Sequence, residues 1–145
     1  HLAQVLLTRN DFVVVDFEGE PGRTFEERRQ RHSPLRDVAG MLRSFAYAQA
    51  AAVRHAAHVP EDSHVLEPLA RTWATATRSA FLSAYFEALR GSALAETAAT
   101  PGLLALFELQ KAVYELRYEL ANRPDWVAIP LAGILDIVAG DAASE

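Results

Sequence analysis

Residues 33–45 read SPLRDVAGMLRSF, and here the hydrophobic pattern changes from the period of a strand to the period of about 3.6 residues of an α-helix. Ser33 is a typical N-cap, and Pro34 suits the first helical position because its missing N–H would have no partner there. The apolar residues that share one face of this helix are Leu35, Val38, Leu42 and Phe45. The sequence therefore predicts a helix that runs toward His58 and ends before Pro60.

The same period predicts three further helices toward the C-terminus. The second covers roughly residues 64–90 and stops at Gly91. Its predicted core stripe consists of Leu66, Leu69, Trp73, Ala76 and Ala80. The third begins at Thr100-Pro101 and ends before Pro124. Its predicted core stripe consists of Leu109, Val113, Leu116 and Leu120. A short fourth helix is expected from Pro130 to Gly140.

Two short apolar runs before these helices indicate a β-hairpin. The runs are Val5–Thr8 and Phe12–Phe17, and the turn-prone triplet Arg9-Asn10-Asp11 joins them. Residues 18–32 are polar and contain Gly and Pro, which predicts a loop with one helical turn.

The length and composition fit one globular domain. The chain has 145 residues, of which 50% are hydrophobic and 23% charged, which is enough to bury a core. We therefore expect a single domain over residues 1–145, with the hairpin at 1–17 and a helical bundle at 33–140. The expected fold class is mainly α with a small β-hairpin.

The charge and the absence of cysteine exclude several kinds of function. A net charge of −5 argues against broad electrostatic binding to nucleic acid or to an anionic membrane. Without cysteine there is no thiolate nucleophile and no Cys-ligated metal. No apolar run reaches the roughly 18 residues of a membrane span, and no signal peptide is evident. A cytoplasmic location without a membrane partner is therefore expected.

The hairpin carries two side chains suited to a hard cation. If Thr8 faces Phe12 across the turn, Gln4 lies directly opposite Asp16, and opposed Cβ atoms are about 4.5–5.5 Å apart. An amide oxygen and a carboxylate could then share Mg²⁺, which takes few protein ligands and completes its shell with water and substrate phosphate. The alternative is that Gln4 is a surface amide and Asp16 a turn residue at the strand end.

Other polar residues carry weaker signals. Glu18 and Glu20 add negative charge near this pair, but a charged loop is usually only solvated, so neither is assigned as a ligand. His55, His58 and His64 lack a metal-binding spacing. The sequence also contains no Gly-rich phosphate loop and no nucleophile-elbow motif.

Lys111, Tyr114 and Tyr118 form an amphipathic stripe on the third helix. Aromatic faces with hydroxyl and ammonium donors suit a sugar, whose ring stacks while its hydroxyls form hydrogen bonds. The alternative is a half-buried boundary with an ion pair between Lys111 and Glu115. Asp37 lies off the apolar stripe of the first helix and could reach another element, although a favourable interaction with the helix dipole is the simpler explanation.

Several of these segments together closely resemble the C-terminal part of bacterial maltokinases, of which related domains occur fused to trehalose synthase. The matching segments are His1–Leu6, Val15–Pro21, Glu27–Arg29, Ser33–Phe45 and Lys111–Leu120. The resemblance extends over almost the whole chain. It implies the C-terminal helical lobe, truncated, of a protein-kinase-like fold similar to that of the aminoglycoside phosphotransferases.

Maltokinases transfer the γ-phosphoryl group of ATP to the anomeric hydroxyl of maltose and so make maltose 1-phosphate. The resemblance implies that His1 and Gln4 match the second His and the Gln of the catalytic-loop motif His-Gly-Asp-x-His-x-x-Gln. The catalytic Asp would then lie two residues before His1, and this segment alone would be inactive. Gln4 and Asp16 would hold Mg²⁺ on the phosphates of ATP.

The resemblance also implies substrate contacts and partners. Asp37 would match a buried carboxylate that supports the catalytic loop beside His1, and Lys111, Tyr114 and Tyr118 would line the maltose pocket. Maltose and ATP would be the substrates, with trehalose synthase as a fused or associated partner in α-glucan (glycogen) biosynthesis. Two alternatives stay open: a kinase of this fold for another sugar or an aminoglycoside, and a non-catalytic helical interaction module.

Overall fold

The computed structural model describes residues 1–17, 24–57, 60–95, 100 and 102–142. A short 3-10 helix, η1 (Leu2–Gln4), leads into an antiparallel hairpin of β1 (Val5–Leu7) and β2 (Phe12–Val14). The helices that follow are α1 (Phe25–Arg29), α2 (Leu35–Ala56), α3 (Pro60–Leu89), α5 (Leu103–Asn122), the 3-10 helix η2 (Pro124–Trp126) and α6 (Ala128–Ala142). The expected fold class, mainly α with a small hairpin, is confirmed.

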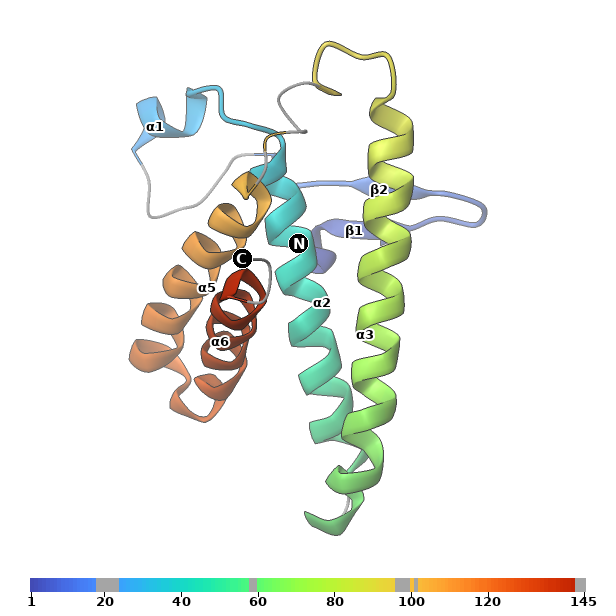
Figure 1. Cartoon of the computed structure of the whole chain (residues 1–145), viewed down its shortest axis with the longest axis vertical. Helices are drawn as coiled ribbons and strands as arrows, with labels where there is room; N and C mark the ends of the chain where they lie inside the picture. The colour runs from blue at the N-terminus through green and yellow to red at the C-terminus, as the bar shows by residue number, and fades with distance from the viewer. Residues whose placement is uncertain (18–23, 58–59, 96–99, 101, 143–145) are drawn as a thin grey trace.

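α2 lies at the centre of the helical part and contacts α3, α5, α6 and η1 (Figure 1). The predicted apolar face of α2 is confirmed as the buried core: Leu35, Val38, Leu42 and Phe45. The side chains packed against it come mainly from α3 and α5: Phe81, Leu82, Tyr85, Leu89, Leu103, Leu104 and Phe107. Phe45 and Phe81 meet edge to face, with ring centroids 5.6 Å apart, which is a favoured aromatic geometry.

The two ends of α2 lie close to their predicted positions. At the start, Ser33 Oγ accepts a hydrogen bond from the backbone N–H of Leu35 at 3.3 Å. This satisfies one of the amides that a helix N-terminus leaves without a partner. At the other end the helix stops at Ala56, before Pro60.

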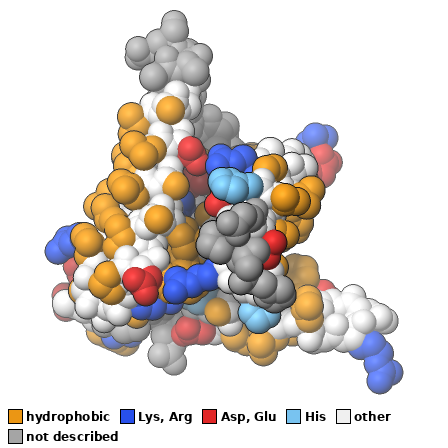
Figure 2. Space-filling model, turned by 90° about the horizontal axis from the view of Figure 1, so that it is seen from below, with side chains coloured by type: hydrophobic (Ala, Val, Ile, Leu, Met, Phe, Trp, Pro, Cys, Tyr) orange, Lys and Arg blue, Asp and Glu red, His pale blue; other side chains and the backbone are white. Residues whose placement is uncertain are grey.

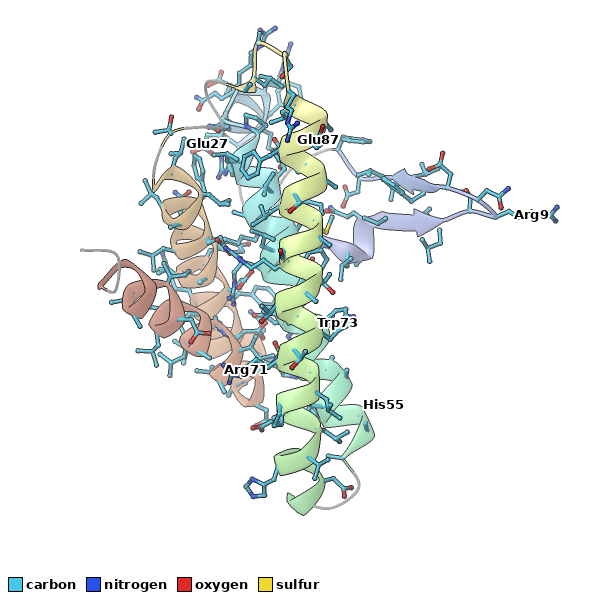
Figure 3. The ribbon with its side chains drawn as sticks, turned by 45° about the vertical axis from the view of Figure 1, so that its right-hand side comes forward. Arg9, Glu27, His55, Arg71, Trp73 and Glu87 are labelled. Atoms are coloured by element: carbon cyan, nitrogen blue, oxygen red, sulfur yellow. The ribbon has the colours of Figure 1, made fainter. Side chains whose placement is uncertain are left out.

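The predicted stripe of α3 is wrong except at Leu66, which is partly buried, although the helix itself and its stop at Gly91 (φ +74°) are confirmed. Leu69 is 64% exposed and Trp73 46% exposed, and Figure 3 shows Trp73 on the side of α3 turned away from α6. The partly buried residues of α3 instead include Ala70, Ala74, Thr77 and Phe81, which recur at helical spacing. Periodicity could not choose between the two faces because both carry apolar residues.

The predicted stripe of α5 is correct only in part, because Leu109 and Leu116 are partly buried. Val113 and Leu120 are exposed, and the buried positions are Glu108, Ala112 and Glu119. The helix ends at Asn122, before Pro124 as predicted, and Pro101 lies outside the described residues. Glutamates are not expected in an apolar stripe, and they are buried here because basic and hydroxyl groups from other elements bond to them.

The interior between α2, α3 and α5 is therefore partly ionic. Arg43 Nε lies 2.9 Å from Glu115 Oε2, and the guanidinium of Arg78 binds both carboxylate oxygens of Glu108. Glu119 accepts hydrogen bonds from Tyr47 Oη at 3.0 Å and from Arg123. Removing one partner of such a buried pair leaves an uncompensated charge and costs about 3–5 kcal/mol.

The hairpin register differs by one residue from the predicted register. Val5 pairs with Val14 and Leu7 with Phe12, and the Thr8 N–H donates to the Asp11 carbonyl at 2.8 Å. The turn is therefore the pair Arg9-Asn10 and not a triplet. The Asp11 side chain fixes this turn because its Oδ1 accepts from the N–H of Phe12. The hairpin extends away from the helices, with Arg9 at its tip (Figure 3).

Hydrophobic side chains remain on the surface of this chain, as Figure 2 shows from below. The most exposed of them on the hairpin, α3 and α6 include Leu7 (87%), Val65 (66%) and Leu135 (60%). Among the described helices, none combines the length and the hydropathy that crossing a bilayer requires.

Candidate functional site

Gln4 and Asp16 are in contact at the base of the hairpin, despite the shifted register. Gln4 Nε2 donates to Asp16 Oδ2 at 2.7 Å, and the Val15 N–H donates to the Gln4 carbonyl at 2.9 Å. Asp16 has φ +64°, in the left-handed region that Asp and Asn tolerate better than most residues. This conformation at the end of the hairpin places the carboxylate beside Gln4. The structure thus brings the predicted pair together by a different backbone path.

The other end of the Gln4 amide already holds a positive group. The His1 ammonium donates to Gln4 Oε1 at 3.0 Å. Partial burial of the ammonium nitrogen is the main cause that lowers its pKa below 8.0, although His1 as a whole residue is exposed. The charge of Lys111 lowers this pKa further, whereas Asp37 and Asp16 oppose the shift. The charges of Asp16 on the hairpin, Asp37 on α2 and Lys111 on α5 therefore all act on the amino group of His1.

η1 is fixed to α2 by a short relay of hydrogen bonds. The N–H of Leu2 donates to Ser44 Oγ at 3.2 Å, and this hydroxyl donates to the Met41 carbonyl at 2.6 Å. The relay holds the N-terminal segment, and with it Gln4, against the middle of α2.

Asp37 is exposed, so the buried carboxylate implied by the resemblance is not found at this position of the chain. The reason is geometric. Leu35, Val38 and Ala39 turn inward in the first turns of α2, which leaves residue 37 on the open side. Its charge still acts on His1, and it raises the pKa of Tyr85 on α3 after the larger effect of burial.

Lys111, Tyr114 and Tyr118 form a half-exposed face of α5, as predicted for a stripe at this spacing. Lys111 Nζ lies 4.9 Å from the ring centroid of Tyr114, and the Arg123 guanidinium lies 5.6 Å from that of Tyr118. The two tyrosines are 45% and 48% exposed, and in the described part of the chain no protein group bonds to either hydroxyl. These hydroxyls are therefore available to a ligand.

Glu115, the expected ion-pair partner of Lys111, bonds through its carboxylate to Arg43 Nε. Burial raises the pKa of Glu115 above its ordinary value of 4.5, although the charges of Arg43 and Lys111 oppose the shift. The spacing of glutamates in the sequence is the signal for this buried position. One face of the helix carries Glu108, Ala112, Glu115 and Glu119.

The remaining candidates do not form a site in the described residues. His55 and His64 are exposed, and no group of three or more His, Cys, Asp or Glu side chains there could hold a metal ion. His58, Glu18 and Glu20 lie outside the described residues. Any cation at Gln4 and Asp16 would thus have two protein side chains and take its other ligands from water or substrate.

Comparison with known proteins bears on this arrangement. No family model matches the chain. A glucosamine kinase of Mycolicibacterium smegmatis is 29% identical over 134 residues, which are 92% of this chain and 32% of that protein. A glucosamine kinase of Streptacidiphilus jiangxiensis is 27% identical over 138 residues, which are 95% of this chain and 30% of that protein.

The likeness is to kinases of an amino sugar. The chain spans about a third of the length of these curated relatives. The similarity to kinases agrees with the expected class of enzyme, whereas neither relative is named a maltokinase.

Proposed function

We propose that this chain is part of an ATP-dependent sugar kinase. The observation that carries the proposal is the meeting of Gln4 and Asp16, at 2.7 Å, beside the charges of Lys111 and Asp37. Two glucosamine kinases align with 92% and 95% of this chain, at 29% and 27% identity, and this supports the same class of reaction. The proposal assigns no catalytic base to residues 1–145.

The donor set at the hairpin base fits Mg²⁺. Gln4 offers an amide oxygen, which accepts a hydrogen bond from the backbone nitrogen of His1, and Asp16 offers a carboxylate. When bound, Mg²⁺ would neutralise charge on the phosphates of ATP. Turning the Gln4 amide by half a revolution would bring its oxygen beside the carboxylate, and the left-handed backbone at residue 16 keeps that carboxylate in place.

The acceptor sugar would lie against the face of α5 that carries Lys111, Tyr114 and Tyr118. Two half-exposed rings offer a stacking surface, and two hydroxyls and one ammonium offer donors. The names of the relatives favour glucosamine, whose ammonium would interact with the carboxylate of Asp37. Maltose, implied by the resemblance noted above, is the competing acceptor.

The direct test is phosphoryl transfer by the complete polypeptide that carries this chain. Purified enzyme would be incubated with Mg²⁺ and ATP, and with glucosamine, maltose, glucose or an aminoglycoside as single acceptors, and sugar phosphate would be identified by mass spectrometry. Product from glucosamine or maltose supports a sugar kinase and identifies its acceptor. A control without Mg²⁺ should give no product.

A folded enzyme that binds ATP but phosphorylates none of these acceptors would contradict the proposal. It would favour the alternative of a non-catalytic helical module. Product from the aminoglycoside alone would keep the kinase chemistry but reject the sugar acceptor.

A further inference from the structure

A groove of about 490 Å³ lies between α2, α3, α5 and α6, away from the base of the hairpin. None of Gln4, Asp16, Lys111, Tyr114 and Tyr118 lines it. The charged lining residues come from four helices: Arg43, Arg71, Arg78, Glu108 and Asp136. The groove is thus a second polar site, independent of the proposed kinase centre.

Arg43 is the unusual residue in this groove. It is only 5% exposed, its Nε binds Glu115, and its Nη2 is buried with no hydrogen-bond partner. A buried charged donor without an acceptor is costly, and native proteins almost always supply a protein group, a water or a ligand.

Gly133 of α6 shows where this guanidinium lies. A Cβ built on Gly133 would lie 1.9 Å from Arg43 Nη1 and 3.1 Å from Nη2. The guanidinium is therefore pressed against the backbone of α6, at a place where both residues line the groove. Glycine at this position allows the close approach.

Of the other charged residues in the groove, Arg78 and Glu108 pair with each other, whereas Arg71 and Asp136 lie exposed at its rim. Arg78 is neutralised by its two contacts with Glu108. Arg71 and Asp136 are exposed, and in the described part of the chain neither forms an ion pair. Figure 3 shows Arg71 on the side of α3 that faces α5 and α6. The groove thus offers a reachable guanidinium and a fixed donor without a matching acceptor.

We propose that this groove binds a small ligand through a phosphate group. Arg71 on α3 contacts it from one side, and the guanidinium of Arg43 donates to it from the wall formed with Gly133. Arg guanidiniums bind phosphate through charge-assisted hydrogen bonds, and donors on two separate helices can contact different oxygens of one tetrahedral phosphate. The negative charge of Asp136 at the rim repels the phosphate and therefore weakens its binding.

The test is a titration of the chain with inorganic phosphate at constant ionic strength, without Mg²⁺ or ATP, followed by NMR chemical shifts. Arg71→Gln should weaken binding by at least about tenfold, because it removes a charge-assisted contact from an exposed position without disturbing the fold. Asp136→Asn should strengthen binding by about twofold or more, because it removes a repulsive charge. Arg90, an exposed arginine directly after the end of α3, supplies the matched control, and Arg90→Gln should have no effect.

A second titration with glucose 6-phosphate distinguishes the source of the phosphate group. Tighter binding than inorganic phosphate would identify a phosphorylated sugar as the ligand, and equal binding would identify the phosphate itself. The proposal is overturned if inorganic phosphate does not saturate, or if Arg71→Gln binds it as well as the unchanged chain. It is also overturned if Asp136→Asn weakens binding, since that result indicates a cationic ligand. The readout involves no phosphoryl transfer, so it is independent of the kinase assay.

Discussion

At the residue scale, Asp16 combines an unusual backbone with a charged contact. Its φ of +64° places its carboxylate 2.7 Å from Gln4 Nε2. Left-handed conformations in residues other than glycine are uncommon, and they concentrate where the surrounding structure requires a specific side-chain position. Asn tolerates the same conformation, which makes Asp16→Asn a substitution that removes charge and little else.

We predict that Asp16→Asn lowers kcat of the complete polypeptide by at least about a hundredfold, the scale of losing one charge-stabilising group. The fold should be retained, because an Asn oxygen can still accept from Gln4. The measurement is kcat together with a thermal melt. Asp125, an exposed carboxylate within η2, supplies the control, and Asp125→Asn should leave kcat unchanged. A kcat of Asp16→Asn close to that of the unchanged protein would contradict the assignment of Asp16 as a ligand of Mg²⁺.

Two glycines should respond to the same substitution with opposite signs. Gly133→Ala places a Cβ 1.9 Å from Arg43 Nη1, and overpacking of this kind costs about 1–3 kcal/mol. Gly40→Ala, inside α2, meets nothing within 4 Å and should stabilise the chain by about 0.5–1 kcal/mol through helix propensity. Urea unfolding of both variants measures the difference. Equal effects would mean that Arg43 does not press against α6.

At the element scale, the sequence predicted where helices begin and end better than which face they bury. Caps, prolines and glycines are local signals, and the core face of α2 was also correct. The faces of α3 and α5 depend on distant partners. α3 packs mainly on α2, which leaves Leu69 exposed, and α5 buries glutamates because Arg43 and Arg78 lie opposite them.

A matched pair of leucines on α3 tests the corrected orientation. Leu82→Ala removes a side chain packed against the core and should cost about 2 kcal/mol or more. Leu69→Ala removes a side chain that is 64% exposed and should change stability by no more than about 0.5 kcal/mol. Chemical unfolding of the two variants under one condition measures both. A larger loss of stability in Leu69→Ala than in Leu82→Ala would support the core face of α3 that was predicted from the sequence.

The buried face of α5 predicts a pH dependence. Because burial raises the pKa of Glu115 above 4.5, the folded chain holds this proton more tightly than the unfolded chain does. The resulting stability is fully present below pH 4.5 and is lost as the pH rises through the folded pKa. Relative to Glu115→Gln, the unchanged chain should therefore gain stability as the pH falls from 7 toward 4.5.

Urea melts at several pH values measure this difference, and Glu67→Gln on the surface of α3 corrects for the general effect of losing one negative charge. A difference between the two proteins that stays constant with pH would show that Glu115 keeps its ordinary pKa.

The candidate site was predictable only in part. Gln4 and Asp16 were expected to meet, and they do, but the expected register was wrong because Asp11 pairs with Thr8 and shortens the turn. Such a one-residue shift depends on side-chain hydrogen bonds in the turn, which residue spacing does not reveal. The exposure of Asp37 follows from the rotation of α2, and no local signal reports it.

At the scale of the whole molecule, the chain divides into a helical part around α2 and a hairpin that extends from it (Figure 1). The exposed side chains of the hairpin include Leu6, Leu7, Phe12 and Val13. Few contacts to the helices stabilise its strands, so local opening should cost much less free energy than unfolding of α2.

We predict that the backbone amides of β1 and β2 exchange with deuterium at least about a hundred times faster than those near Leu42 in α2. Hydrogen exchange measured by mass spectrometry on the chain resolves the two regions. The α3 segment around Phe81 is the internal control and should be protected like α2. Protection of the hairpin equal to that of α2 would show that the two parts unfold as one unit.

The ionic interior also bears on the order in which the chain is synthesised. A ribosome makes Arg43 and Arg78 before Glu108 and Glu115, and α2 and α3 leave it before α5, so for part of translation the two arginines lack the carboxylates that neutralise them. During that interval both guanidiniums must stay hydrated, and the two helices can associate only loosely. α5 (Leu103–Asn122) would then complete the interior, and slow codons between residues 90 and 108 would prolong the open, hydrated intermediate.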